Sequence, residues 1–287
     1  MALRTGTSTT SSPESATEPT KPDPTGSADS TPPDAPLTGR ARVLLWWEIA
    51  AVFAVSLGAS GVYALVSYIG SLTARQSLHA QQVILNGSQA PGRPLLDLFL
   101  QLVSLGSGVA PVILVFYLLA RGGEGPSSIG VDRSQPVKDL LRGMGLAAVI
   151  GGSGLGLYLL AYKAGLNVNV VAESLPDVWW RFPVLILSAL QNGLLEEVLV
   201  IGYLLTRLRK LAIPPAWAVV IAATLRGSYH LYQGFGGFAG NAVMGLIFGF
   251  LFLRWRRAAP MIVAHTLIDG VAFVGYALLV GHVSWLP

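Results

Sequence analysis

Residues 182–206 read FPVLILSALQNGLLEEVLVIGYLLT, an apolar run that contains the adjacent acids Glu196 and Glu197. About 20 mostly apolar residues are enough for a helix to cross a hydrocarbon core about 30 Å thick. The chain has seven such runs, at about residues 43–70, 95–120, 140–162, 182–206, 211–229, 238–253 and 259–280. Strand pairs are not expected, because alternation is absent and open sheet edges do not occur in hydrocarbon. The sequence therefore predicts an all-α fold, a polytopic transmembrane helix bundle of about seven spans, or eight.

The composition agrees with this fold class. Only 12% of the 287 residues are charged, 52% are apolar, and the chain contains no cysteine. An ordinary soluble domain has about 25% charged residues. These values exclude a disordered protein and a disulfide scaffold. The formal net charge is only +4, and the basic residues are scattered between apolar runs, which excludes a nucleic-acid binder and favours contact with the lipid bilayer.

The chain divides into three regions. Residues 1–41 are rich in Ser, Thr and Pro, and they lack the large apolar side chains needed to offset the entropy of ordering. They are predicted to form a disordered cytoplasmic tail. Residues 42–139 contain the first two predicted transmembrane helices and an inner loop, and residues 140–287 contain the remaining helices.

The basic residues of the loops predict the orientation, because short loops on the cytoplasmic side of a membrane are enriched in Lys and Arg. If the N-terminus is inside, the inner segments contain Arg40, Arg42, Arg121, Arg133, Lys138, Arg142, Arg207, Arg209, Lys210, Arg254, Arg256 and Arg257. The outer segments then contain only Arg75, Arg93, Lys163 and Arg181. We therefore predict an integral protein of the plasma membrane with a cytoplasmic N-terminus.

Acidic residues within the apolar runs are candidates for a functional site. A charged side chain at the middle of a membrane helix costs about 2.5–3.5 kcal/mol on insertion scales. Glu48 and Asp97 lie near the ends of their runs, where a structural role is favoured, whereas Glu196 and Glu197 lie mid-run. Adjacent side chains point about 100° apart around an α-helix, so both acids cannot face one cavity equally. The alternative is that both acids pair with Arg226 and only fix helix packing.

Two histidines accompany these acids. Arg226 and His230 are spaced i, i+4, as are His265 and Asp269, so each pair shares one helical face. Asn241 in the sixth run is either an interhelical hydrogen-bonding residue or part of a cavity. These polar groups on apolar helices predict one convergent site.

The residues allow two kinds of chemistry. In one, a glutamate and a histidine polarise a water that attacks a peptide carbonyl, while the second histidine and the aspartate hold the oxyanion. In the other, His230, His265 and Glu196 bind zinc, which activates the water. The spacings do not decide between these alternatives, and the sequence has no HExxH motif.

Three motifs together resemble a known family. They are Glu196-Glu197, the segment from Leu225 to His230 (LRGSYH), and the segment from His265 to Asp269 (HTLID). Their order and spacing resemble the CPBP (Abi) intramembrane proteases, which include the type II CAAX prenyl endopeptidases and bacteriocin-processing proteins. The resemblance covers roughly residues 140–280, so it makes residues 140–287 the CPBP-like catalytic core.

The resemblance implies an endopeptidase that cleaves a membrane-associated protein or peptide by a glutamic-type mechanism rather than as a metalloprotease. Glu196 would be the water-activating base, assisted by His230, while His265 and Asp269 would stabilise the oxyanion. Glu197, Arg226 and Asn241 would support these groups. No cofactor is expected on this interpretation, with zinc as the alternative.

The chain departs from the family pattern at two positions. The family usually has Arg four residues after the second glutamate, where this chain has Ile201, and often has Phe at the position of Arg226. We hypothesise that Arg226 replaces the missing Arg as the partner of the glutamates. Two other functions are compatible with the same residues, a proton-coupled transporter and a catalytically degenerate membrane scaffold.

The depths of the candidate residues in the membrane, estimated from the helical rise, do not all agree. Counted from the nearest inner basic residues, Glu196 lies about 16 Å deep and His265 about 12 Å deep. His230 lies about 30 Å from Lys210, or about 22 Å if Pro214 and Pro215 delay the start of its helix. The sequence does not explain how His230 reaches Glu196.

Overall fold

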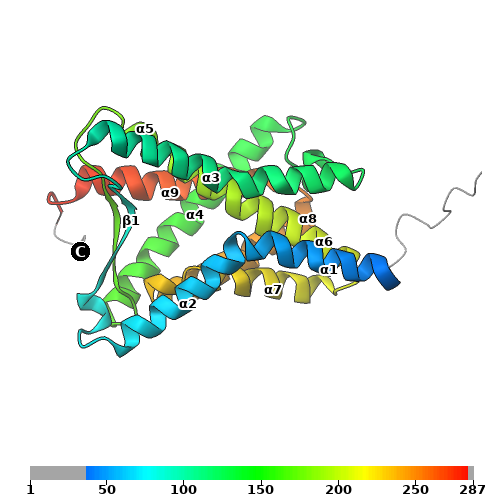
Figure 1. Ribbon diagram of the computed structural model, residues 1–287, viewed down its shortest axis with the longest axis horizontal. Helices are drawn as coiled ribbons and strands as arrows, with labels where there is room; N and C mark the ends of the chain where they lie inside the picture. The colour runs from blue at the N-terminus through cyan, green and yellow to red at the C-terminus, as the bar shows by residue number, and fades with distance from the viewer. Residues whose placement is uncertain (1–36, 284–287) are drawn as a thin grey trace, which may run out of the picture. The chain divides into compact units, whose positions relative to one another are not determined.

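The computed structural model describes residues 37–283, and most of them are helical (Figure 1). Of the predicted tail at residues 1–41, residues 1–36 lie outside this range, and helix α1 begins at Gly39. The α-helices are α1 (Gly39–Ala54), α2 (Leu57–Thr73), α3 (Pro94–Arg121), α4 (Pro136–Lys163), α5 (Arg181–Glu196), α6 (Leu205–Lys210), α7 (Pro215–Ser228), α8 (Phe235–Trp255) and α9 (Ala259–Leu279).

The number of spanning helices is close to the prediction. Among the described residues, five helical segments are long and apolar enough to cross a membrane, at Pro94–Arg121, Pro136–Lys163, Arg181–Lys210, Phe235–Trp255 and Ala259–Leu279. A sixth crossing results if α1 and α2 form one span, bent by 53°. The predicted run at 211–229 contains only the 14-residue helix α7, which begins at Pro215 because proline is favoured at the first position of a helix.

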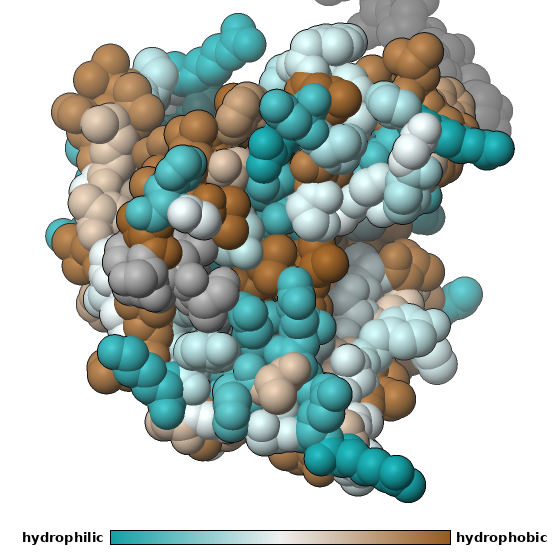
Figure 2. All heavy atoms as spheres, turned by 90° about the vertical axis from the view of Figure 1, so that its left-hand side faces the viewer, coloured by the Kyte–Doolittle hydropathy of each residue, from teal (hydrophilic) through white to brown (hydrophobic). Residues whose placement is uncertain are grey.

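The departure from an all-helical fold is a short parallel strand pair, β1 (Gln82–Gly87) with β2 (Asn169–Ser174). The register pairs Gln82 with Asn169 and Gly87 with Ser174. Both strands lie between helices, in the segments that join α2 to α3 and α4 to α5, where an open sheet edge need not face hydrocarbon. Viewed from this end of the helices, many residues are hydrophilic, interspersed with hydrophobic ones (Figure 2).

The opposite ends of the helices are joined by a buried arginine. Arg257, in the turn between α8 and α9, donates hydrogen bonds to both carboxylate oxygens of Asp139 at the start of α4 and to Asp132 in the preceding loop. The loop backbone approaches closely, since Ala258 N donates to Ile129 O at 2.9 Å. Gly130 is required there, because its φ is +68° and an added Cβ would lie 2.3 Å from Arg257 Cα. The Arg257 guanidinium, together with Ser134, lowers the pKa of Asp132.

The two acids expected to be structural bind elsewhere in the fold. Glu48 on α1 accepts hydrogen bonds from Tyr203 OH at 2.8 Å and Arg207 Nε at 3.1 Å. Asp97 at the start of α3 accepts from Ser88 Oγ and from Gln89 N. These contacts fix helix ends and the loop before α3.

The candidate residues lie on the helices that pack against one another in the C-terminal half. Helix α7 packs along α8, and α9 packs between α4 and α5. The segment between α5 and α6 is buried and contributes Val198, Leu199, Val200, Ile201, Tyr203 and Leu204 to the main hydrophobic core. The site is therefore built on the most enclosed part of the described chain.

Replacing Arg257 with Met should destabilise the fold by about 3–5 kcal/mol, because it leaves the buried Asp139 carboxylate without its partner. The free energy of unfolding in detergent micelles measures this effect. Arg254→Met is the matched control, because Arg254 is exposed at the end of α8; it should change the unfolding free energy by less than about 0.5 kcal/mol. Equal effects of the two substitutions would contradict a specific role for Arg257.

Candidate active site

The helix that contains the adjacent glutamates changes its hydrogen-bonding pattern between them. Glu196 is the last residue of α5, and Glu197 is the first residue of a π-helix, η3 (Glu197–Leu204). The i→i+5 pattern of a π-helix widens the turn, and such segments occur often at functional sites. The expectation that both acids cannot face one cavity equally was made for a regular α-helix. In the structure both carboxylates contact Arg226.

Arg226 is the central charge of the cluster and is 0% exposed. Its Nη1 lies 2.6 Å from Glu197 Oε1, and its Nη2 lies 3.3 Å from Glu196 Oε2. The planar guanidinium presents several donors in a fixed geometry, which suits it to holding two carboxylates at once. The guanidinium carbon of Arg226, Cζ, also lies 5.5 Å from the ring centroid of Phe248 on α8. The contact that the sequence hypothesis requires between Arg226 and the glutamate pair is therefore present.

His265 on α9 contacts both Arg226 and Glu197. Its Nδ1 lies 2.8 Å from Glu197 Oε1 and 3.1 Å from Arg226 Nη2. A ring nitrogen either donates or accepts a hydrogen bond, so Nδ1 donates to Glu197 when it carries a proton and accepts from Arg226 when it does not. In the neutral ring, the second arrangement leaves the proton on Nε2.

His230 lies on the other side of Glu196, in the turn after α7. Its Nδ1 lies 3.0 Å from the carbonyl oxygen of Arg226, which can only accept, so Nδ1 carries the proton. In the neutral ring Nε2 is then an acceptor, and it lies 3.8 Å from Glu196 Oε1. This distance is too long for a direct hydrogen bond. The other oxygen of Glu196 accepts a hydrogen bond from Tyr229 OH at 2.9 Å.

Asp269 lies one helical turn after His265. Its Oδ2 is 3.7 Å from His265 Nε2 and accepts a hydrogen bond from Asn192 Nδ2 at 2.9 Å. The sequence interpretation did not include Asn192. Its spacing from Glu196 is the signal that would have identified it, since residues four apart share one face of α5.

The remaining predicted residue, Asn241 on α8, makes a local contact. Its Nδ2 donates to the backbone oxygen of Gly237 at 3.1 Å, one turn earlier in the same helix. The structure thus brings together Glu196, Glu197, Arg226, His230, His265 and Asp269 through the contacts given above, and Asn241 contacts its own helix.

The conflict about the depth of His230 disappears once the helix ends are known. Helix α6 ends at Lys210 and α7 begins at Pro215, so the two helices diverge from one short turn. Glu196 lies 14 residues before the end of α6, and His230 lies 15 residues after the start of α7, so a similar length of chain separates each of them from the same short turn. The sequence estimate started from Arg207 and Lys210 rather than from these ends.

A metal at this site would have to share it with Arg226. Glu196, Glu197 and His265 offer ligand atoms that all lie within 4.8 Å of one another. This group differs from the zinc ligands considered from the sequence, which included His230. The guanidinium nitrogens of Arg226 lie 2.6, 3.3 and 3.1 Å from atoms of these three residues. A divalent cation held by these three residues would lie close to the positive charge of Arg226.

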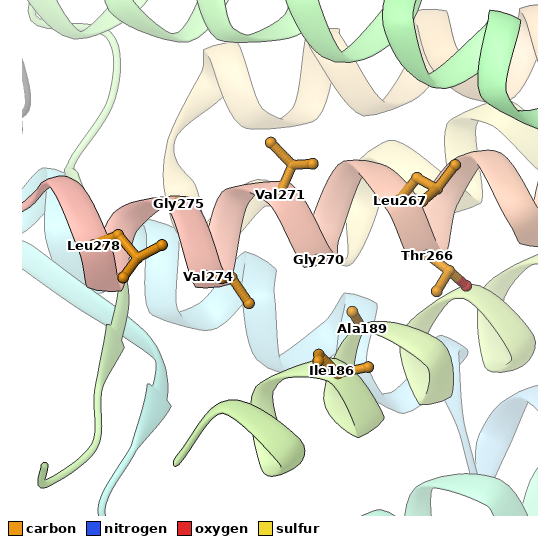
Figure 3. Close-up of a pocket in the computed structure, with 9 residues that line it drawn as sticks. All are labelled: Ile186, Ala189, Thr266, Leu267, Gly270, Val271, Val274, Gly275 and Leu278. Atoms are coloured by element: carbon orange, nitrogen blue, oxygen red, sulfur yellow. The ribbon is translucent and has the colours of Figure 1, made fainter.

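An open apolar groove lies beside the helices that carry the site. It has a volume of about 460 Å³ and lies between α5 and α9 (Figure 3). Its lining is almost entirely apolar, with Ile186 and Ala189 on α5 and Val271 and Val274 on α9. Two further lining residues, Thr266 and Gly270, directly follow His265 and Asp269 in the chain.

A comparison with protein families agrees with the motifs. Residues 178–271 match the family described as type II CAAX prenyl endopeptidase Rce1-like. This segment resembles that family. The match confirms the resemblance predicted from the three motifs, and it covers about a third of the chain. No match was found among curated proteins or among solved structures.

The Rce1-like segment contains all the residues of the cluster described above. At the level of the family, the match supports an intramembrane CAAX-type protease that acts on a membrane-associated substrate. The apolar helices and the family together make the chain an integral membrane protein.

Replacing Arg226 with Met should destabilise the fold by about 3–5 kcal/mol, because Glu197 is fully buried and would lose its charged partner. Adding Glu197→Gln should recover part of this loss by removing the unpaired charge. The double-mutant cycle, measured as free energies of unfolding in detergent, gives the coupling between the two residues. Additive effects would contradict a direct ion pair.

Proposed function

We propose that the protein is an intramembrane endopeptidase in which Glu196 and His230 activate a water for attack on a peptide bond. The observation that carries this proposal is the distance of 3.8 Å between Glu196 Oε1 and His230 Nε2. Both atoms are hydrogen-bond acceptors when His230 is neutral, so they cannot form a hydrogen bond with each other. One water that donates a hydrogen bond to each of them satisfies both acceptors.

The contacts of the two side chains assign their roles. Tyr229 and Arg226 occupy Glu196 Oε2, which leaves Oε1 to take a proton from the water. The backbone oxygen of Arg226 holds the Nδ1–H of His230, so Nε2 accepts the second water hydrogen. A positioned base of this kind contributes about 10²–10⁴-fold to a reaction rate.

The reaction has two steps. As Glu196 removes the proton, the water oxygen bonds to the carbonyl carbon, and the C=O π electrons move onto the carbonyl oxygen to form an oxyanion. The oxyanion then reforms the C=O bond, the C–N bond breaks, and the protonated Glu196 returns its proton to the leaving nitrogen. His265, with its proton on Nε2, donates to the oxyanion. The products are a carboxylic acid and an amine, and the acid then passes its remaining proton to the amine to give a carboxylate and an ammonium group.

Three features support a glutamic-type mechanism over a metalloprotease mechanism. Among the described residues, the group that could hold a metal leaves out His230, the histidine proposed to bind the water. Arg226 contacts every residue of the Glu196, Glu197 and His265 group. The same guanidinium takes the part of the Arg that the family has at the position of Ile201, so Glu197 holds the arginine and the second histidine rather than the water.

The core that carries this chemistry is residues 140–287, and the substrate is a membrane-associated protein or peptide. The apolar groove between α5 and α9 favours a substrate that reaches the site from the bilayer, because Thr266 and Gly270 connect its lining to His265 and Asp269. Residues 42–139 support this core, as Glu48 on α1 binds both Tyr203 and Arg207.

Glu196→Gln should abolish cleavage and His230→Ala should reduce kcat by about 10²–10⁴-fold, because each removes one of the two groups that bind the water. The measurement is cleavage of a peptide library by the purified protein in detergent or liposomes, followed by mass spectrometry. Wild-type cleavage should survive a chelator of divalent metals. Cleavage by Glu196→Gln at the wild-type rate would contradict the proposal, cleavage lost with the chelator would favour zinc, and a folded wild type that cleaves nothing would favour a transporter or a scaffold.

We also propose that the N-terminus lies in the cytoplasm and that the protein resides in the plasma membrane. The helix ends opposite the strands and their loops carry twelve basic residues, namely Arg40, Arg42, Arg121, Arg133, Lys138, Arg142, Arg207, Arg209, Lys210, Arg254, Arg256 and Arg257. The ends near the strands carry four, namely Arg75, Arg93, Lys163 and Arg181. This distribution follows the positive-inside rule.

The absence of cysteine from the sequence makes the orientation easy to test. Gln76→Cys, in the exposed loop after α2, should react with a membrane-impermeant thiol reagent on intact cells. Gln135→Cys, exposed before α4, should react only after the cells are permeabilised. The reverse labelling pattern would invert the topology.

A further inference from the structure

The proposed hydrolysis requires hydrogen-bond donors for the oxyanion. Donors aimed at the developing charge are among the largest contributions to catalysis of acyl transfer. The resemblance assigned this role to His265 and Asp269. An ionised carboxylate has no proton to donate, so an ionised Asp269 can hold an oxyanion only through other groups.

Asn192 on α5 supplies the missing kind of group at this place. Its Nδ2 lies 2.9 Å from Asp269 Oδ2, which orients the side-chain amide. An amide nitrogen carries two hydrogens, and Asp269 takes one of them. Asn192 precedes Glu196 by four residues, so the amide lies on the same face of α5 as the proposed base.

Asp269 also lies near the second donor. Its Oδ2 is 3.7 Å from His265 Nε2 and at the same time accepts from Asn192. The carboxylate therefore holds the amide in a fixed orientation and lies near the imidazole, whose orientation is fixed at Nδ1 by Glu197 and Arg226. Neither donor needs to reorganise when charge develops, which is the condition for effective stabilisation.

We propose that Asn192 is a catalytic residue that donates its second Nδ2–H to the oxyanion, together with His265, and that Asp269 orients this amide. This inference rests on the proposed peptide hydrolysis. One oxyanion donor is thereby assigned to Asn192 on α5 instead of Asp269 on α9. Since α5 also carries Glu196, one helix positions both the base and this donor.

The test is a pair of substitutions measured against the same peptide substrate. Asn192→Ala should reduce kcat by about 10²–10³-fold, as expected for one oxyanion donor, with little change in KM. Adding Asp269→Asn should recover at least about tenfold of this loss, because the introduced amide stands within 2.9 Å of the position that Asn192 Nδ2 occupied. Asn192→Leu, which keeps the volume but has no donor, should behave like Asn192→Ala.

Gln191→Ala is the matched control, because it removes an amide from the next residue of the same helix. The Gln191 side chain lies against Gly108 of α3 and away from the cluster, since an added Cβ on Gly108 would meet Gln191 Cδ at 2.6 Å. Its kcat should stay within about twofold of the wild type, as for other substitutions outside a site.

Three outcomes would overturn the inference. A wild-type kcat in Asn192→Ala and Asn192→Leu would show that the amide takes no part in the reaction. A lower melting temperature in both variants, with no recovery of kcat by Asp269→Asn, would show that Asn192 only links α5 to α9 structurally. A wild-type protein that cleaves nothing would overturn the proposed function itself, which the wild-type and Glu196→Gln assays detect independently of Asn192.

Discussion

The contact between Arg226 and the adjacent glutamates is the interaction on which the site depends. Arg226 and Glu197 are both 0% exposed, and their closest atoms are 2.6 Å apart. Removing one partner of such a pair leaves an uncompensated charge, so each residue requires the other. The same guanidinium reaches Glu196 and His265, and the backbone oxygen of Arg226 fixes His230. One residue thus positions both histidines and both acids.

The helix geometry makes this contact possible. The change from α5 to the π-helix at Glu197 lets two consecutive carboxylates reach one arginine. The far end of the π-helix is fixed by Tyr203, which donates to Glu48 on α1. Glu48 therefore serves the site indirectly, because it helps to hold the segment from which Glu196 and Glu197 project.

Much of the fold and part of the site could be predicted from particular residues. The apolar runs predicted the spanning helices, because length and hydropathy are local properties, and the i, i+4 spacings predicted which residues share a face. The bend between α1 and α2 and the short α7 were not predicted, since hydropathy does not distinguish a continuous helix from a broken one. The strand pair was not predicted either, because its pairing joins segments 87 residues apart in the chain.

The sequence by itself determined that this is a membrane protein with a rare cluster of ionisable residues on its last helices, because charge in hydrocarbon is costly and its few positions stand out. It also determined the family resemblance, since three motifs occur in the right order. Only the tertiary structure decided which atoms meet: that Arg226 forks between Glu196 and Glu197, that His230 turns its free nitrogen toward Glu196, and that Asn192 binds Asp269. These contacts depend on helix ends, rotation and the π-helix, which one-dimensional spacing does not specify.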